Sequence, residues 1–368
     1  DLTSTTMANN QQRKDSEYVK LLKYKQMSGS KASQDFATKK WAWVGQTKEY
    51  LLTTGLTEAG IEYVAGEVLG EKGNKIMVKI DQETKEVPKD KFEKMNPPKF
   101  EGVEDCGELG HLNEPCVFHN LRTRYVADII YTYSGLFLVA INPYKWIKIY
   151  TPEMIELFKG KRRQDIAPHV FAMADNAYRN MMTDRMNQSM LITGESGAGK
   201  TENTKKVIQY LAYRAGVSKK VGGASGTLDQ KIVQANPLLE ALGNAKTKRN
   251  HNSSRFGKFI KITFSKSKIS GASIIHYLLE RSRVIMRGPG ERNFHIFYQM
   301  LHGMDVSKKT TYFLTTPDQY QYLNPGGRET IYTDPDVDDL DEYKQTVEAC
   351  NTLGFNDAET ETIFKVVA

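Results

Sequence analysis

The octet GESGAGKT at residues 194–201 constrains this chain more than any other feature. It fits the pattern G-x-x-x-x-G-K-[ST], whose glycines let consecutive backbone N–H groups turn inward around phosphate oxygens. In such a loop the lysine reaches the β- and γ-phosphates, and the Ser or Thr hydroxyl holds Mg²⁺. The octet therefore predicts a nucleoside triphosphate site and phosphoryl-transfer chemistry.

The sequence on either side of the octet gives it the expected context. Residues 189–193 form a short apolar run that predicts a buried strand. Residues 201–215 carry apolar side chains such as Val207 and Leu211 at helical spacing, and Gly216 stands where a helix C-cap is expected. A chance match to the pattern is the alternative, but it would not predict this order of strand, loop and helix.

Length and composition limit the class of protein. A chain of 368 residues is long enough for two or three domains, and 39% hydrophobic with 26% charged residues is typical of a soluble globular protein. No apolar run approaches the ~20 residues of a membrane span. The basic residues behind the net charge of +7 are scattered, so we expect neither a membrane nor a nucleic acid partner. The cysteines show no C-x-x-C spacing, which fits a reducing cytoplasm without disulfides or zinc.

Three regions follow one another along the chain. Residues 1–35 are polar and predict an extended or partly helical arm. Residues 36–93 predict a small β-barrel, because short apolar or alternating segments are separated by turn residues and hold two tryptophans suited to its core. The expected strands are 41–44, 62–68, 75–80 and 84–87. Residues 94–368 then change to an α/β pattern.

Within the α/β region, local sequence patterns predict most of the expected helices and strands. A hairpin is predicted at 129–141 through Ser134 and Gly135. The Gly- and Ser-rich stretch 216–227 predicts a flexible surface loop. Further helices are expected at 152–159, 170–183, 228–242 and 291–303, and strands at 258–264 and 273–286.

Two features near the end of the chain need interpretation. The acidic run 334–339 lacks the Gly and Glu of a calcium-binding EF-hand, since Asp339 and Gln345 stand at those positions, so a solvated acidic turn is expected. Residues 356–359 look like a capping box that opens a helix. The sequence ends at Ala368 inside that apolar pattern, so we expect a fragment of a longer protein.

A second polar segment, NHNSSRFG at 250–257, gains meaning beside the phosphate loop. Alone it is a polar loop before a strand. A nucleoside triphosphate hydrolase, however, needs a second set of donors that closes over the γ-phosphate, and Ser, Asn and backbone amides suit that role.

Long runs of this sequence resemble the motor domains of myosins, most closely class II (muscle-type) ones. The resemblance extends over residues 36–368. It rests on 142–145 (NPYK), 160–181, 192–212 and 234–262, together with HYLLERSRV and ERNFHIFYQML. It implies an Src-homology-3-like barrel followed by a phosphate-loop NTPase core, in which helices flank a mixed, twisted central sheet. It also implies an ATP-driven actin motor with ATP and Mg²⁺ as cofactors.

The resemblance also implies roles for individual residues. Lys200, Asn250, Ser253 and Arg255 resemble the residues that act on the γ-phosphate and the attacking water, and Arg255 resembles one that pairs with a switch II glutamate. Thr201 and Ser254 resemble the Mg²⁺ ligands. The nucleotide contacts implied are Asn142, Tyr150, Gly194, Glu195, Ser196, Gly197, Ala198, Gly199, Lys200, Thr201, Glu202 and Asn250, with Asn142 and Tyr150 at the adenine.

The chain departs from the family pattern in three places. Lys148 stands where a proline is usual, and His251 replaces a residue that is usually acidic. No Asp has a Gly three residues on, so the switch II motif D-x-x-G-F-E is absent and is expected beyond Ala368. Without the strands of that missing part the phosphate-loop strand would lack neighbours, so we expect these residues alone to form no stable ATPase.

The expected partners follow from the same resemblance: actin filaments, light chains and a second heavy chain, mainly through regions outside this sequence. The expected location is the cytoplasm, in a muscle myofibril or thick filament. Two alternative functions make different predictions. A GTPase would need D-x-x-G and N-K-x-D, and neither occurs. A nucleotide-binding scaffold that does not hydrolyse ATP would bind without turnover.

Overall fold

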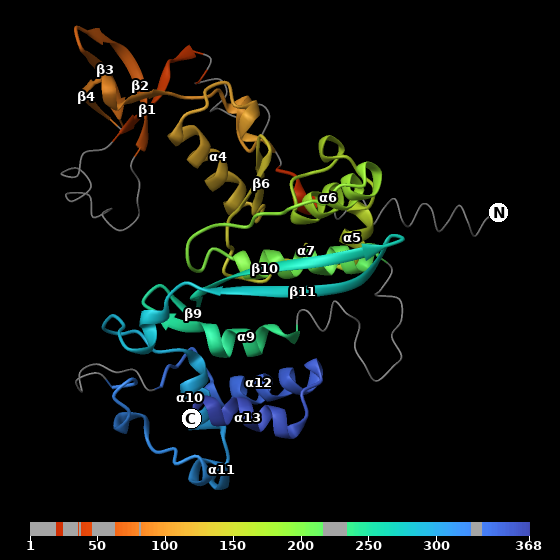
Figure 1. The fold of residues 1–368 in the computed structure, drawn as a ribbon. Helices are drawn as coiled ribbons and strands as arrows, with labels where there is room; N and C mark the ends of the chain where they lie inside the picture. The colour runs from red at the N-terminus through yellow and green to blue at the C-terminus, as the bar shows by residue number, and fades with distance from the viewer. Residues whose placement is uncertain are drawn as a thin grey trace. The chain divides into compact units, whose positions relative to one another are not determined.

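The structure is a computed structural model that describes residues 20–24, 36, 38–45, 63–80, 82–215, 234–324 and 333–368. It divides into two compact units, Asp1–Asn176 and Ala177–Ala368, with the division inside helix α6 (Val170–Asp184). We describe each unit by itself, with the element labels of Figure 1. Most of the predicted arm 1–35, the loop 216–227 and the first residues of the helix predicted at 228–242 lie outside the described residues.

The N-terminal unit begins with a five-stranded antiparallel sheet in the order β4-β3-β2-β1-β5. Its strands are β1 (Trp41–Gly45), β2 (Tyr63–Lys72), β3 (Lys75–Ile80), β4 (Glu83–Pro88) and β5 (Phe92–Lys94). Alternate residues of β3 are buried, as a strand with one covered face requires. These side chains build the sheet's own core of Val44, Ile76, Val78, Ile80 and Val87. The strands expected between residues 41 and 87 are confirmed.

The tryptophans differ from the expectation. Trp43 is buried, but it packs with Cys106, Leu109 and Cys116 instead of joining the core of the sheet. Cys116 lies in helix α4 (Glu114–Val126). Trp43 therefore joins the sheet to the segment that follows it in the chain.

In the rest of this unit, the buried side chain of Arg124 connects helix α4 to the segments around it. Helix α4 starts at Asn113, whose side chain caps the backbone N–H of Cys116. Farther along α4, buried Arg124 donates to Thr132 Oγ1 at 2.8 Å and to the carbonyls of Gly102 and Tyr131. It thereby fixes the predicted hairpin, which forms as β6 (Tyr131–Ser134) and β7 (Phe137–Ala140). The helices α5 (Pro152–Phe158) and α6 also lie where they were expected.

The C-terminal unit combines two hairpins with a layer of helices, visible in green to blue in Figure 1. Its core holds Ala241, Ala245, Phe294, Ile296, Met300, Met304 and Phe364. A short hairpin over residues 244–254 contributes Ala245 to that core. The elements are α7 (Lys200–Arg214), α9 (Asn236–Gly243), β8 (Asn244–Thr247), β9 (Asn250–Ser254), β10 (Phe256–Ser265), β11 (Lys268–Leu278), α10 (His295–Gly303), α11 (Val306–Thr311), α12 (Asp339–Leu353) and α13 (Asp357–Val367).

Helix α13 confirms a prediction about its start. The Asn356 side chain accepts from the backbone of Glu359, and the Glu359 side chain accepts from the backbone of Asn356. This is the reciprocal capping box that the sequence indicated. Among the described residues, no helix has the length and apolar character that crossing a membrane requires.

The strand predicted at 189–193 is wrong for this structure. These residues have no regular structure, and the Leu191 side chain is 91% exposed. A strand exists only when its N–H and C=O groups find a neighbour, and none of the described strands pairs with this segment. The apolar run alone could not supply that neighbour.

The strand predicted at 273–286 ends earlier, because β11 stops at Leu278. A short 3₁₀ turn, η6 (Arg281–Val284), follows instead. Its Arg283 is buried and donates to Glu280, Glu291 and the Arg292 carbonyl. Satisfying that buried guanidinium requires the chain to turn back on itself rather than to remain extended.

The acidic run 334–339 is also not the solvated turn that was expected. Asp334 and Asp339 are both buried. Asp334 pairs with Lys246 of β8, and Asp339 accepts two hydrogen bonds from Arg292, at 2.7 and 2.8 Å. Cationic partners far away in sequence make this burial possible.

Gly66 in β2 provides a test of the packing in the N-terminal sheet. A Cβ at this position would lie 2.3 Å from Val78 Cγ1, and Val78 is fully buried. Gly70, in the same strand, has no atom within 4 Å of the corresponding position. We expect Gly66→Ala to lower the free energy of unfolding by about 1–3 kcal/mol, and Gly70→Ala to change it by less than about 0.5 kcal/mol. Denaturant unfolding of both variants checks this, and equal losses would contradict the packing.

Candidate nucleotide-binding site

The phosphate loop has the backbone shape that its glycines predict. Gly197 and Gly199 have φ angles of 81° and 91°, and Gly194 has 154°. The first two lie in the left-handed region, where glycine avoids a steric penalty. Gly199 is also the N-cap of α7 and, lacking a side chain, offers no capping group. The first-turn N–H groups of α7 and the positive end of its dipole can therefore serve an anion.

Lys200 lies across this loop. Its ammonium donates to the carbonyls of Gly194 and Glu195, both at 2.8 Å. A cation in this position adds to the dipole of α7 and favours a negatively charged ligand. Thr201 follows in the first turn of the helix, half-buried.

The structure brings the second predicted segment against the loop. The hydroxyls of Ser196 and Ser253 are 2.8 Å apart, and Asn250 Nδ2 is 3.5 Å from Ser196 Oγ. Ser253 is buried and pairs in register with Ala245 on β8. Because Ala245 belongs to the core of the unit, the position of Ser253 is set by packing.

Arg255 contacts the Ser253 hydroxyl and is itself fixed by Glu280. Its Nη1 donates to Ser253 Oγ at 2.9 Å, and its Nε donates to Glu280 Oε2 at 2.5 Å. Burial alone would raise the pKa of Glu280, but hydrogen bonds from Arg283 and Arg255 hold the pKa below its usual value. Glu280 therefore remains ionised at neutral pH and fixes the guanidinium.

Sequence reasoning missed Glu280. It assigned the partner of Arg255 to a switch II glutamate that this chain does not contain. The run Glu-Arg-Ser-Arg at 280–283 carried a local signal, since a glutamate three residues before an arginine often forms an ion pair. Nothing in that run indicated a second arginine 25 residues upstream.

Asn252 holds the hairpin to the neighbouring helix. Its Nδ2 donates to Glu240 Oε2 of α9 at 2.9 Å, and its Oδ1 accepts from Asn244 at 2.7 Å. Within β9, Asn250 and Ser253 thus approach the phosphate loop, whereas Asn252 binds α9.

Two groups of side chains could be considered for a cation. Thr201 lies in the first turn of α7 and Ser254 ends β9, and hydroxyl oxygens of this kind suit Mg²⁺. His251, Asp334 and Asp336 also bring three ligand-type atoms within 4.8 Å of one another. There the ammonium of Lys246 already contacts Asp334 Oδ2, so we interpret this cluster as a set of ion pairs.

The predicted adenine residues belong to the N-terminal unit. The Tyr150 hydroxyl lies 2.9 Å from that of Tyr131, and its ring meets Phe171 edge-on. Asn142 Oδ1 accepts from the Tyr144 backbone at 3.1 Å. Since these residues and the phosphate loop fall in different units, their role at the adenine stays a prediction.

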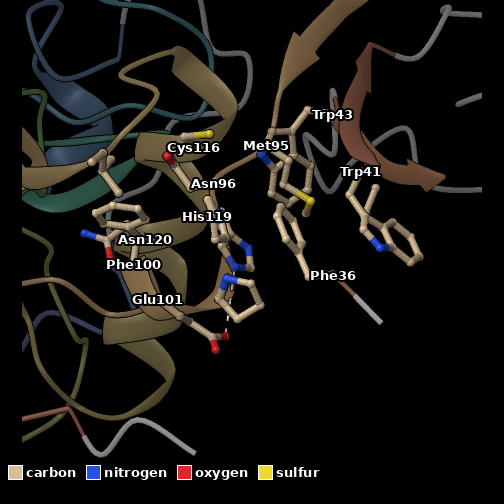
Figure 2. A pocket seen from close by; sticks show the side chains of 14 residues that line it. Phe36, Trp41, Trp43, Met95, Asn96, Phe100, Glu101, Cys116, His119 and Asn120 are labelled. Atoms are coloured by element: carbon tan, nitrogen blue, oxygen red, sulfur yellow. Dashed lines mark ion pairs between the residues drawn. The ribbon is translucent and has the colours of Figure 1, made fainter. Parts of the chain in front are cut away.

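The N-terminal unit also contains a cavity of about 330 Å³ beside the five-stranded sheet. Figure 2 shows Trp41 and Trp43 on one side of it and His119 and Asn120 of α4 on the other. His119 lies 4.0 Å from Glu101, and burial lowers the pKa of the imidazole. No residue predicted to bind nucleotide lines this cavity.

The ion pair beneath Ser253 can be tested by a double-mutant cycle. We expect Arg255→Ala and Glu280→Ala to show a coupling on the order of 1 kcal/mol in unfolding free energy, because each side chain is mostly buried. The exposed pair Arg162–Asp165 is the matched control and should show a smaller coupling. Equal couplings in both cycles would argue against the proposed support.

Comparison with known proteins connects this geometry to one family. The family described as Myosin head (motor domain) matches residues 103–368. The non-muscle myosin-2 heavy chain of Acanthamoeba castellanii is 48% identical over 359 residues, which cover 96% of this chain and 22% of the relative. Myosin-3 of Caenorhabditis briggsae is 47% identical over 94% of this chain, and myosin-3 of Caenorhabditis elegans is 48% identical over 92%. Each match covers 17% of the worm protein.

The chain thus spans about a fifth of the length of the curated relatives it matches. The family match covers most of the sequence, including the phosphate loop and the hairpin that faces it. The chain belongs to the myosin head (motor domain) family.

Proposed function

We propose that this chain supplies the nucleotide-binding part of an ATP-hydrolysing, actin-based motor. The observation that carries the proposal is the contact between the phosphate loop and the β8–β9 hairpin, through Ser196 and Ser253. Two segments that meet in this way can enclose a triphosphate from opposite sides. Family membership supports the same interpretation.

The site residues have distinct roles in this proposal. The loop 194–201 and Glu202 would bind the phosphates, with Lys200 moving from the loop carbonyls onto the β- and γ-phosphate oxygens. Asn250 and Ser253 would orient the water that attacks in line with the leaving group. Arg255, held by Glu280, would keep Ser253 in place. Catalysis of this kind is mostly positioning and charge stabilisation.

The chemistry of the donor set suits Mg²⁺, since Thr201 in the first turn of α7 and Ser254 at the end of β9 both offer a hydroxyl oxygen. When bound, the ion supplies charge neutralisation on the phosphate oxygens. The adenine would be bound by Asn142 and Tyr150.

The wider assignments rest on the family alone. We propose actin filaments as partners, and light chains and a second heavy chain as partners of segments outside this sequence. We also propose that residues 36–93 form an Src-homology-3-like barrel after an arm at 1–35, and that 94–368 belong to the motor core. Cytoplasmic action is part of the proposal. A place in a muscle thick filament stays a hypothesis, since one relative is named as non-muscle.

The role of Lys200 is tested by substitution in the motor protein that contains this sequence. We expect Lys200→Ala to weaken binding of a fluorescent ATP analogue by at least about 100-fold, because the phosphates lose their charge-assisted contacts with the Lys200 ammonium. Lys261→Ala, an exposed lysine on β10, is the matched control and should leave binding unchanged. Tight binding by Lys200→Ala would contradict the assigned site.

Phosphate release in the same samples separates an ATPase from a nucleotide-binding scaffold. Turnover in the parent protein, lost in Ser253→Ala while nucleotide still binds, would support hydrolysis at this site. Binding without phosphate release in the parent protein would favour the scaffold.

A further inference from the structure

The cavity beside the five-stranded sheet has the size and the wall of a ligand site, and it plays no part in the proposed nucleotide site. Its volume of about 330 Å³ falls in the range of small-molecule pockets. Four aromatic side chains and one imidazole ring line it: Phe36, Trp41, Trp43, Phe100 and His119. Figure 2 shows Phe36, Trp41 and Trp43 together on one side of the cavity and His119 across from them.

The alternation of strand β1 presents both tryptophans to this cavity. Trp41 and Trp43 are two residues apart, so their side chains lie on the same face of the strand. Val44 lies on the other face and joins the core of the sheet. Ala65 of β2 pairs with Trp43 in the ladder and also lines the cavity. Its small side chain leaves room beside the Trp43 ring.

Hydrogen bonds hold the other walls of the cavity. The side-chain amide of Asn96 binds the backbone of His111 through both of its polar atoms, at 2.6 and 2.8 Å. Asn113, which caps helix α4, also donates to a backbone carbonyl of β5 at 2.9 Å. Helix α4 is thus attached to β5, and its His119 ring lies 5.1 Å from the Trp43 ring. A cavity that is already formed spares a ligand the cost of ordering it.

The charge at the cavity favours a cation. Glu101 is the one charged side chain among the described residues that line it, and its carboxylate lies 4.0 Å from His119 Nε2. Burial lowers the pKa of the His119 imidazole below its ordinary value, so the ring is uncharged near neutral pH. Lys99 lies over the Phe100 ring at 5.0 Å but is not part of the cavity wall. The wall itself therefore carries a net negative charge.

The polar side chains of the wall offer a ligand few hydrogen-bond partners. Asn96 is occupied by the contacts above, and the Cys116 thiol donates to a carbonyl of β5 at 3.3 Å. Asn120 Nδ2 donates to the Val103 carbonyl at 3.1 Å, and its Oδ1 is inaccessible to solvent. A primary ammonium has three N–H donors, some of which would stay unsatisfied here. A quaternary ammonium has no N–H, and the negative faces of aromatic rings attract it.

We propose that this cavity binds a small quaternary ammonium ion, with its alkyl groups against the indole rings of Trp41 and Trp43 and its charge toward Glu101. Tryptophan is the strongest aromatic partner of a cation. Phe100 already accepts the Lys99 ammonium over its ring, which leaves the tryptophans for the ligand. The site is separate from the phosphate loop, so the inference goes beyond the proposed function and does not depend on it.

Two molecules of the same shape test the role of the charge. Choline carries a trimethylammonium group, and its uncharged isostere is the alcohol in which a carbon atom replaces the nitrogen. Ligand-observed NMR titration of the motor protein that contains this sequence measures a dissociation constant for each. We expect choline to bind about 5- to 30-fold more tightly, which is the size of a desolvated cation–π contact. Equal affinities, or no saturable binding of choline, would overturn the inference.

Substitution of Trp41 tests the place of binding. Trp41 is only partly buried and belongs to neither apolar cluster of the sheet, so we expect its variants to fold. Trp41→Leu should weaken choline binding about three- to tenfold, whereas Trp41→Phe should keep most of the affinity because phenylalanine retains an aromatic face. Trp146→Leu is the matched control, since Trp146 is 92% exposed and does not line the cavity. Parent-like affinity in Trp41→Leu would overturn the inference.

Glu101→Gln separates the charge from the shape of the cavity. It should weaken choline binding about two- to fivefold, the size of a partly exposed ion pair, and leave the uncharged isostere unaffected. Glu108→Gln removes an exposed carboxylate outside the cavity wall and should change neither affinity. Thermal unfolding curves like that of the parent protein show that each variant is folded, and Glu101→Gln decides the question if Trp41→Leu does not fold. Unchanged choline affinity in Glu101→Gln would overturn the assigned role of the carboxylate.

Discussion

The hydrogen bond between Ser196 and Ser253 is the contact on which the candidate site depends. It joins two residues that are 57 positions apart in sequence. A different part of the unit fixes the segment that carries each of them. Glycines with positive φ shape the loop that presents Ser196, and core packing of Ala245 sets the strand that carries Ser253. The contact is therefore a consequence of two independent structures meeting, and a change in either would separate the hydroxyls.

A chain of polar contacts runs from that bond into the interior. Arg255 donates to Ser253, Glu280 accepts from Arg255, and Arg283 donates to Glu280 and Glu291. Buried charges of this kind cost free energy unless each has a partner, so removing Glu280 would take away the carboxylate that binds Arg255. This linkage makes the geometry at Ser253 depend on residues that never approach a nucleotide.

Local patterns in the sequence were enough to predict much of the fold, because they depend on neighbours a few residues away. The strands β1 to β4 follow from short alternating or apolar runs, the start of α13 from its capping box, and the loop before α7 from its glycines. The strand expected at 189–193 failed because a strand needs a neighbour, and the sequence run says nothing about which segment supplies it. The partner of Arg255 was missed for a similar reason: Glu280 is close in space but 25 residues away in sequence.

The acidic run 334–339 shows that partners far away in sequence can bury residues that the local pattern places in water. Six residues containing four aspartates are expected to face water, since a carboxylate is rarely buried without a partner. Lys246, 88 residues upstream, and Arg292 supply those partners, so Asp334 and Asp339 lie inside. Lys246 lies on the hairpin that carries Ser253, and Asp339 begins helix α12, which packs against α9 and α10. Of these two cations, Lys246 also attaches the turn to the β8–β9 hairpin. The position of a strand in the candidate site thus depends on a residue 88 positions away in sequence.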